Sequence, residues 1–256
     1  PRSLYLPRIR LYFSVPLHCY AALFCLKLKV APCTLPLHLP MMCGTMDSKA
    51  PPSTTRVLVL GSSVSTGCGA DNPEQDGWFA LMRDAVHPLG FKVECRGLGG
   101  TNVVYWGQEP LPDDLDSFGV VMMCLSLGNE GLAGAHKPAH LSEVEQHYLD
   151  GLHYIAKRLR QKMSPNARLV LGGPYPNNDY KEAHLEVLLR VHNSMCGWDE
   201  VDHVIDFLQP CLNDGKGNWH AGASTDPGHP NNTGHQQMFA CLSLQDVLGQ
   251  SVDSVN

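Results

Sequence analysis

The sequence predicts a three-layer α/β/α protein with a central parallel sheet of about five strands, as in flavodoxin-like folds. Its apolar runs, such as residues 56–60 and 120–125, are continuous rather than alternating, which is typical of parallel strands covered on both faces. Amphipathic helical patterns separate successive runs, and the runs end in turns rich in glycine, serine or asparagine. This alternation indicates βαβ units with right-handed crossovers.

The elements follow one another in regular order. The first predicted helix begins near Gly77 and places Trp78, Leu81, Met82 and Val86 on one face, with Trp78 in the core. We expect the next to begin at Ser142, with Glu145 completing a capping box. The predicted strands are residues 56–60, 91–95, 120–125, 168–171 and 201–207, and the remaining predicted helices are residues 181–196 and 233–248.

Length and charge limit the classes of function. The chain has 256 residues, 43% hydrophobic and 17% charged, enough for one sizeable domain with its core. Its net charge is −6, and residues 1–45 carry +5, which leaves −11 for the rest of the chain. An acidic body argues against nucleic acid or an anionic membrane as a partner.

Residues 1–50 differ from the remainder, and we expect them to form a segment outside the domain of residues 51–256. The apolar run at residues 11–26 is interrupted by Pro16 and His18 and is too short to span a bilayer. It resembles a targeting peptide, which would make the protein secreted or organellar. If translation starts at Met46, the segment is not native and the protein is cytoplasmic. The sequence leaves both readings open.

The ten cysteines predict neither disulfides nor a metal site. Four lie in residues 1–45, and the other six form no CxxC pair and no zinc-type cluster. We expect reduced thiols, no metal and no cofactor.

One long connection, residues 208–230, has little periodic pattern, and such loops are usually functional. It carries Asp226 and His229, three residues apart and bounded by prolines. If this stretch forms one turn, the Asp226 carboxylate can accept the Nδ1–H of His229 and leave Nε2 free as a base. Such a pair requires a nucleophile from elsewhere in the chain.

Candidate partners follow the other strands. Ser62 and Ser63 come after the first strand, Gly100 after the second and Asn129 after the third. Each alone would be an ordinary cap or turn residue. Because ligands bind at the carboxyl ends of parallel strands, all of these groups are expected at one edge of the sheet. Together they provide a hydroxyl nucleophile, backbone and amide donors, and a base with its orienting acid.

In this order, the blocks resemble those of the SGNH hydrolases, also called GDSL esterases or lipases. Gly61-Ser62-Ser63-Val64 matches the family's Gly-Asp-Ser-Leu block, and Asp226 to Pro230 matches its Asp-x-x-His-Pro block. Gly97-Leu98-Gly99-Gly100 and Leu127-Gly128-Asn129-Glu130 match the two blocks between them. The resemblance covers about residues 55–248.

The resemblance implies a catalytic triad of Ser63, His229 and Asp226. It also implies an oxyanion hole formed by the Ser63 and Gly100 N–H groups and the Asn129 amide. Ser62 and Glu130 depart from the pattern, since the family usually has aspartate at both positions. Neither supplies the nucleophile, base or donors, so we expect them to affect loop geometry and rate.

The sequence therefore favours a serine esterase that hydrolyses a small-molecule carboxylic ester through an acyl-enzyme. An acyltransferase using the same site and a non-catalytic carbohydrate- or lipid-binding module are the alternatives. A flavodoxin-like phosphate binder would not require Asp226 and His229, and no phosphate loop is evident. The sequence determines neither the ester nor the oligomeric state.

Three aromatic residues near these blocks are candidates for lining a substrate pocket, although packing beneath loops is the slightly favoured reading for each of them taken singly. They are Trp106, Tyr175 and Trp219.

Overall fold

The computed structural model describes residues 55–249, and the prediction for residues 1–50 lies outside this range. It contains the expected parallel sheet, with strand order β2-β1-β3-β4-β5. The strands are β1 (Thr55–Gly61), β2 (Phe91–Cys95), β3 (Val120–Cys124), β4 (Arg168–Gly172) and β5 (His203–Ile205). The predicted fold class is confirmed.

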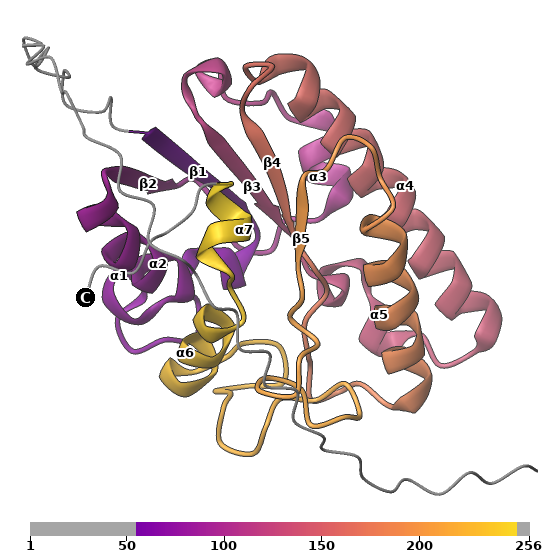
Figure 1. Ribbon diagram of the computed structural model, residues 1–256. Helices are drawn as coiled ribbons and strands as arrows, with labels where there is room; N and C mark the ends of the chain where they lie inside the picture. The colour runs from indigo at the N-terminus through magenta and orange to yellow at the C-terminus, as the bar shows by residue number, and fades with distance from the viewer. Residues whose placement is uncertain (1–54, 250–256) are drawn as a thin grey trace, which may run out of the picture. The chain divides into compact units, whose positions relative to one another are not determined.

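Helices cover both faces of the sheet (Figure 1). On one face lie α1 (Pro73–Asp76), α2 (Trp78–Val86), α6 (Asn232–Ala240) and α7 (Leu244–Leu248), and on the other lie α3 (Val103–Gln108), α4 (Pro138–Lys162) and α5 (Glu182–Met195). Short 3-10 helices η1–η5 occupy Ser63–Thr66, His87–Leu89, Leu115–Ser117, Leu127–Glu130 and Leu132–Gly134.

Alternate residues of each central strand face opposite helical layers. In β1, Val57 and Val59 belong to the core on the α2 side, whereas Leu58 and Leu60 belong to the core on the α4 side. All four are fully buried, which explains why the run is continuous in sequence. Trp78 is also fully buried, as expected.

Three predicted boundaries were wrong. Helix α4 begins at Pro138 rather than Ser142, because proline at the first position is preorganised for a helix, and Glu145 pairs with Arg190 at 2.7 Å instead of capping. The predicted 233–248 helix is two helices, since Ser243 caps α7 by accepting the N–H of Asp246. Strand β5 ends early, where the Asp206 side chain accepts the Leu208 N–H.

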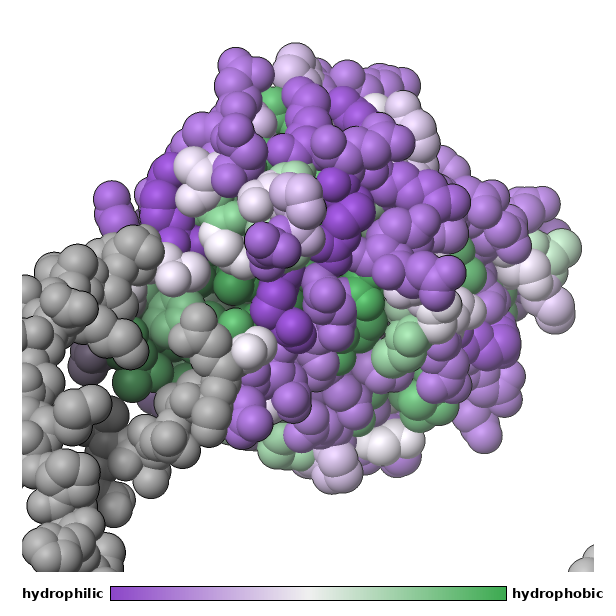
Figure 2. All heavy atoms as spheres, turned by 45° about the horizontal axis from the view of Figure 1, so that its top comes forward, coloured by the Kyte–Doolittle hydropathy of each residue, from purple (hydrophilic) through white to green (hydrophobic). Residues whose placement is uncertain are grey.

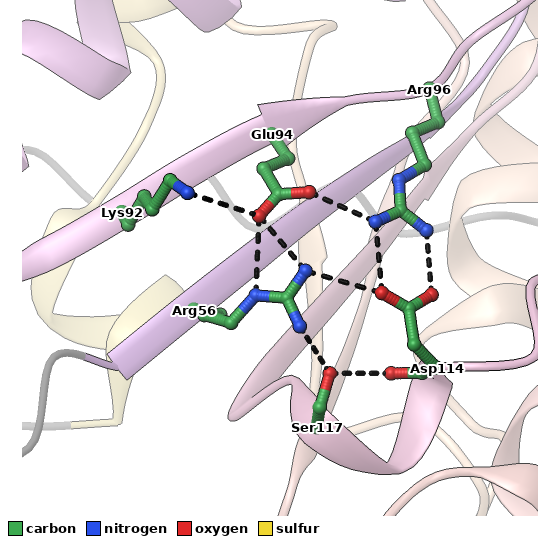
Figure 3. Close-up of polar contacts among 6 residues, drawn as sticks. All are labelled: Arg56, Lys92, Glu94, Arg96, Asp114 and Ser117. Carbon is green, nitrogen blue, oxygen red and sulfur yellow. Dashed lines mark hydrogen bonds and ion pairs between the residues drawn. The ribbon is translucent and has the colours of Figure 1, made fainter.

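A charged cluster covers the edge strand β2 (Figure 3). Arg56 and Arg96 both pair with Glu94 at 2.9 Å and with Asp114 at 3.2 and 2.6 Å, respectively. Both guanidinium groups also lie over the Phe118 ring, at 4.0 and 5.2 Å from its centroid. The cluster thus joins β1, β2 and the segment before β3.

These contacts change the acidity of both carboxyl groups. Hydrogen bonds from Arg96 and Arg56 hold the pKa of Asp114 well below its usual range. Burial alone would raise the pKa of Glu94, but its bonds to the same two arginines outweigh burial and lower it. The cluster runs along the edge of the sheet, because Arg56 lies near the amino end of β1 whereas Glu94 and Arg96 lie at the carboxyl end of β2. Figure 2, in which the top of Figure 1 is turned forward, shows that hydrophilic side chains predominate on the described surface seen from that side.

We predict that the cluster makes stability depend on pH in the acid range. A carboxyl group whose pKa is lower in the folded state stabilises the fold above its unfolded pKa, about 4, and this contribution is lost as the pH falls further. Asp114→Asn should therefore lower the melting temperature at pH 7 and lower it less at pH 2, because the contribution disappears only as the pH falls through the folded pKa. The matched control is Asp113→Asn, because Asp113 is exposed and makes no ion pair within residues 55–249. Equal losses at both pH values would contradict the prediction.

Candidate active site

The turn after β1 presents Ser63 at the carboxyl edge of the sheet. Gly61 has φ +148°, and a Cβ atom there would lie only 2.0 Å from the Cys124 carbonyl oxygen, so this position requires glycine. The next residue, Ser62, is fully buried and donates its N–H to the same oxygen at 3.1 Å. Ser63 then begins η1 with its side chain at the site.

Ser63, His229 and Asp226 form one hydrogen-bonded chain. Ser63 Oγ lies 3.0 Å from His229 Nε2, although 166 residues separate them in sequence. His229 Nδ1 lies 2.9 Å from Asp226 Oδ2. The structure thus brings together the three residues that the sequence selected for the triad.

The ionisation state of Asp226 determines which ring nitrogen of His229 carries the proton. Burial by itself would raise the pKa of Asp226, but hydrogen bonds from the His229 ring and the Gly228 N–H outweigh it and lower the pKa. An ionised carboxylate can only accept, so Nδ1 carries the proton and Nε2 presents its lone pair. Ser63 therefore donates its hydroxyl proton to Nε2 in this state.

Local contacts fix the 208–230 loop, which lies at the lower edge of Figure 1. Asp226 Oδ1 accepts the N–H groups of Gly228 and His229 at 2.8 and 2.9 Å. The Pro227 carbonyl accepts the Trp219 Nε1–H at 3.2 Å and the Asn178 N–H at 2.9 Å. The turn is held from both sides, which limits the positions open to the imidazole.

The segments that carry the predicted oxyanion donors are joined to one another, and one of them passes beside Ser63. A Cβ atom at Gly99 would lie 3.7 Å from Ser63 Cβ, so the second block passes beside the serine. Gly100 has φ +76°, which favours glycine. Neither the Ser63 N–H nor the Gly100 N–H donates to any residue of the described range. Asn129 Nδ2 donates one hydrogen to the Thr101 carbonyl at 2.8 Å, which fixes the amide and leaves its second N–H available.

Glu130 connects the third block to the second. Its side chain is 1% exposed and accepts the N–H of Val103, the first residue of α3, at 2.9 Å. Burial raises the pKa of Glu130, and the bond from Val103 and the nearby His147 oppose this rise only in part. Glu130 therefore joins the segment after β3 to the start of α3.

Ser62, the other departure, is fully buried. Within residues 55–249, its Oγ and the buried Tyr175 hydroxyl have no hydrogen-bond partner. Burial raises the pKa of Tyr175 to about 12, so the phenol is neutral.

The three aromatic pocket candidates are all buried. Trp106 belongs to the α4-side core and donates its Nε1–H to Thr101 Oγ1 at 2.9 Å. Tyr175 and Trp219 lie with ring centroids 6.0 Å apart beneath the loop of His229. Their burial favours packing beneath the loops over contact with a substrate.

Two residues that the sequence reasoning did not select also lie at this edge. His235 is fully buried, accepts the Trp78 N–H on Nδ1 and contacts the Cys68 carbonyl through Nε2, so it joins α6 to the segment after Ser63. Asn177 lies in the segment that follows β4. Within residues 55–249, no group of three or more metal-binding side chains gathers.

The fold and this arrangement define an α/β/α protein of the SGNH hydrolase fold. The model of the GDSL-like lipase/acylhydrolase family matches residues 59–237, and the chain belongs to this family. No curated protein sequence matches the chain. No helix in the described range is both long and apolar enough to cross a membrane.

Solved structures share the fold at low sequence identity. The chain is similar to TesA, with 22% identity, a TM-score of 0.53, and coverage of 73% of this chain and 95% of TesA. It is also similar to phospholipase A1 from Streptomyces albidoflavus NA297, with 16% identity, a TM-score of 0.54, and coverage of 73% of this chain and 97% of the phospholipase. An extracellular lipase from Streptomyces rimosus is similar at 15% identity, with a TM-score of 0.55 and coverage of 72% of this chain and 96% of the lipase.

Replacing Glu130 tests its structural role. Glu130→Ala leaves the Val103 N–H without an acceptor, so we predict a loss of about 1–3 kcal/mol in the free energy of unfolding. Glu130→Gln keeps an acceptor oxygen and should lose less. Urea denaturation measures both, with Glu143→Ala on the exposed face of α4 as the control, expected within about 0.5 kcal/mol of the parent. A Glu130→Ala protein as stable as this control would contradict the role.

Proposed function

We propose that the protein is a serine esterase that hydrolyses carboxylic esters through an acyl-enzyme on Ser63. The observation that carries the proposal is the 3.0 Å contact between Ser63 Oγ and His229 Nε2, with His229 oriented by Asp226. Membership of a lipase and acylhydrolase family supports the same reaction class.

The first half-reaction acylates the enzyme. Ser63 Oγ attacks the ester carbonyl while its proton passes to His229 Nε2, and Asp226 stabilises the resulting imidazolium. The oxyanion accepts hydrogen bonds from the Ser63 N–H, the Gly100 N–H and the Asn129 amide. When the intermediate collapses, the carbon–oxygen bond to the alcohol breaks and His229 returns the proton to the departing oxygen.

The second half-reaction releases the acid. Water attacks the acyl-enzyme and transfers a proton to His229, and collapse of the second intermediate returns that proton to Ser63 Oγ. An acceptor alcohol in place of water would give acyl transfer from the same intermediate. His229 takes part in every proton transfer of the two half-reactions.

Ser63→Ala tests the nucleophile. We expect the parent protein to hydrolyse p-nitrophenyl esters from acetate to palmitate with some preference in chain length, and the variant to show none of this turnover. A fluorophosphonate should label the parent and not the variant. A folded parent that neither hydrolyses any ester nor takes the label would overturn the proposal in favour of a binding module.

Asn129→Ala tests the oxyanion hole. A donor that acts mainly in the transition state affects kcat more than KM, and its removal should lower kcat by roughly a hundredfold or more. Steady-state kinetics on p-nitrophenyl acetate separates the two constants. A change confined to KM would show that Asn129 binds the ground state instead. Adding an acceptor alcohol in the same assay distinguishes hydrolysis from acyl transfer.

A further inference from the structure

The loop after β4 places an amide between two proposed parts of the active site. Asn177 Nδ2 lies 3.5 Å from the position of a Cβ atom at Gly128 and 3.6 Å from that at Gly228. These glycines directly precede Asn129 and His229 in the chain. Asn177 therefore lies between the loop of the proposed oxyanion donor and the loop of the proposed base.

The amide is held in place, and its donor side is free. The Asn177 N–H donates to the Gly217 carbonyl at 2.9 Å, and Oδ1 accepts the Asp179 N–H at 2.9 Å. Nδ2 donates to no residue of the described range. The half-buried side chain thus offers two fixed N–H donors to a molecule in the site.

An open cavity of about 520 Å³ lies beside the same loop, and the four residues that follow Asn177 in the chain belong to its lining. Buried His184 links its two walls, because Nδ1 accepts the Lys181 N–H and Nε2 donates to the Ala135 carbonyl, both at 2.9 Å. The buried Tyr180 ring stacks on His184, with centroids 5.5 Å apart. The lining is mostly polar and consists of Ala133, Gly134, His136, Asn178, Asp179, Tyr180 and Lys181.

The chemistry of the reaction indicates which part of an ester would face this cavity. His229 must return a proton to the departing alcohol oxygen, so the alcohol part lies on the side of His229. Asn177 stands beside Gly228 on that loop. The cavity lining provides the amide of Asn178, the ammonium of Lys181, the imidazole of His136 and the carboxylate of Asp179. All of these groups form hydrogen bonds with hydroxyl groups.

We propose that Asn177 and this cavity form the binding site for the alcohol part of the substrate, and that this alcohol carries hydroxyl groups close to the ester oxygen. Asn177 Nδ2 donates a hydrogen bond to a neighbouring hydroxyl, and the cavity receives the remainder of a polyol or sugar. This inference rests on the proposed esterase function and specifies its substrate class.

The test compares two esters with one acyl group. Glycerol monoacetate and propyl acetate both give an acetyl-enzyme, and their three-carbon alcohols differ in hydroxyl groups. We expect kcat/KM, followed by pH-stat titration, to favour the glycerol ester by at least about tenfold in the parent. Asn177→Ala should lower this ratio about tenfold. A methyl glucoside monoacetate, run beside them, distinguishes a sugar from a glycerol-type alcohol.

Asn177→Asp provides the matched variant. It keeps an oxygen that can accept the Asp179 N–H and removes the donor, so it should lower the same ratio even if Asn177→Ala folds poorly. Asn166→Ala, an exposed asparagine before β4 at the opposite edge of the sheet, should keep the parent ratio.

Each outcome decides between the proposals. A parent ratio near one, or a ratio that neither variant changes, overturns the inference and leaves the esterase proposal intact. If the variants lose kcat/KM equally on both esters, Asn177 contributes to the oxyanion hole or to loop structure, and this outcome also overturns the inference. If the folded parent hydrolyses none of the esters, p-nitrophenyl acetate included, the esterase proposal itself fails.

Discussion

The parallel direction of the five strands is the constraint on which the site depends. Because every strand ends at the same edge, residues far apart in sequence arrive within hydrogen-bond distance, as Ser63 and His229 do across 166 positions. The Asp226 turn then fixes the imidazole, and its carboxylate determines which ring nitrogen carries the proton. A shift of the 208–230 loop relative to β1 would separate the base from the serine without altering either residue.

Buried polar contacts rather than the sheet alone hold the loops in position. Glu130 accepts the first N–H of α3, Asn129 donates to the Thr101 carbonyl, and His235 joins α6 to the segment after the serine. Each of these contacts joins two segments that follow different strands. Along the edge of the sheet, the Arg56 cluster joins β1 to the edge strand β2 (Figure 3).

Much of the fold followed from local pattern. Continuous apolar runs located the three central strands β1, β3 and β4, since burial on both faces requires apolar side chains at consecutive positions, whereas the edge strands β2 and β5 mix apolar and polar residues. Boundaries were less certain where a single side chain decided them. Ser243 divides the last predicted helix in two, and the cap predicted at Ser142 does not form because Pro138 starts that helix earlier. These outcomes depend on competition between neighbouring turns, which periodicity does not represent.

The sequence by itself determined the fold class, the family and the residues selected for the triad and oxyanion hole, because these residues lie in short sequence blocks that follow the predicted strands in order. Only the tertiary structure placed Ser63, His229 and Asp226 in one hydrogen-bonded chain and found Val103 as the partner of Glu130. It also showed that the three aromatic candidates are buried and placed Asn177 between Gly128 and Gly228. The reason is physical: these contacts join loops whose separation in space is set by strand order and packing, and no local pattern in the chain encodes that separation.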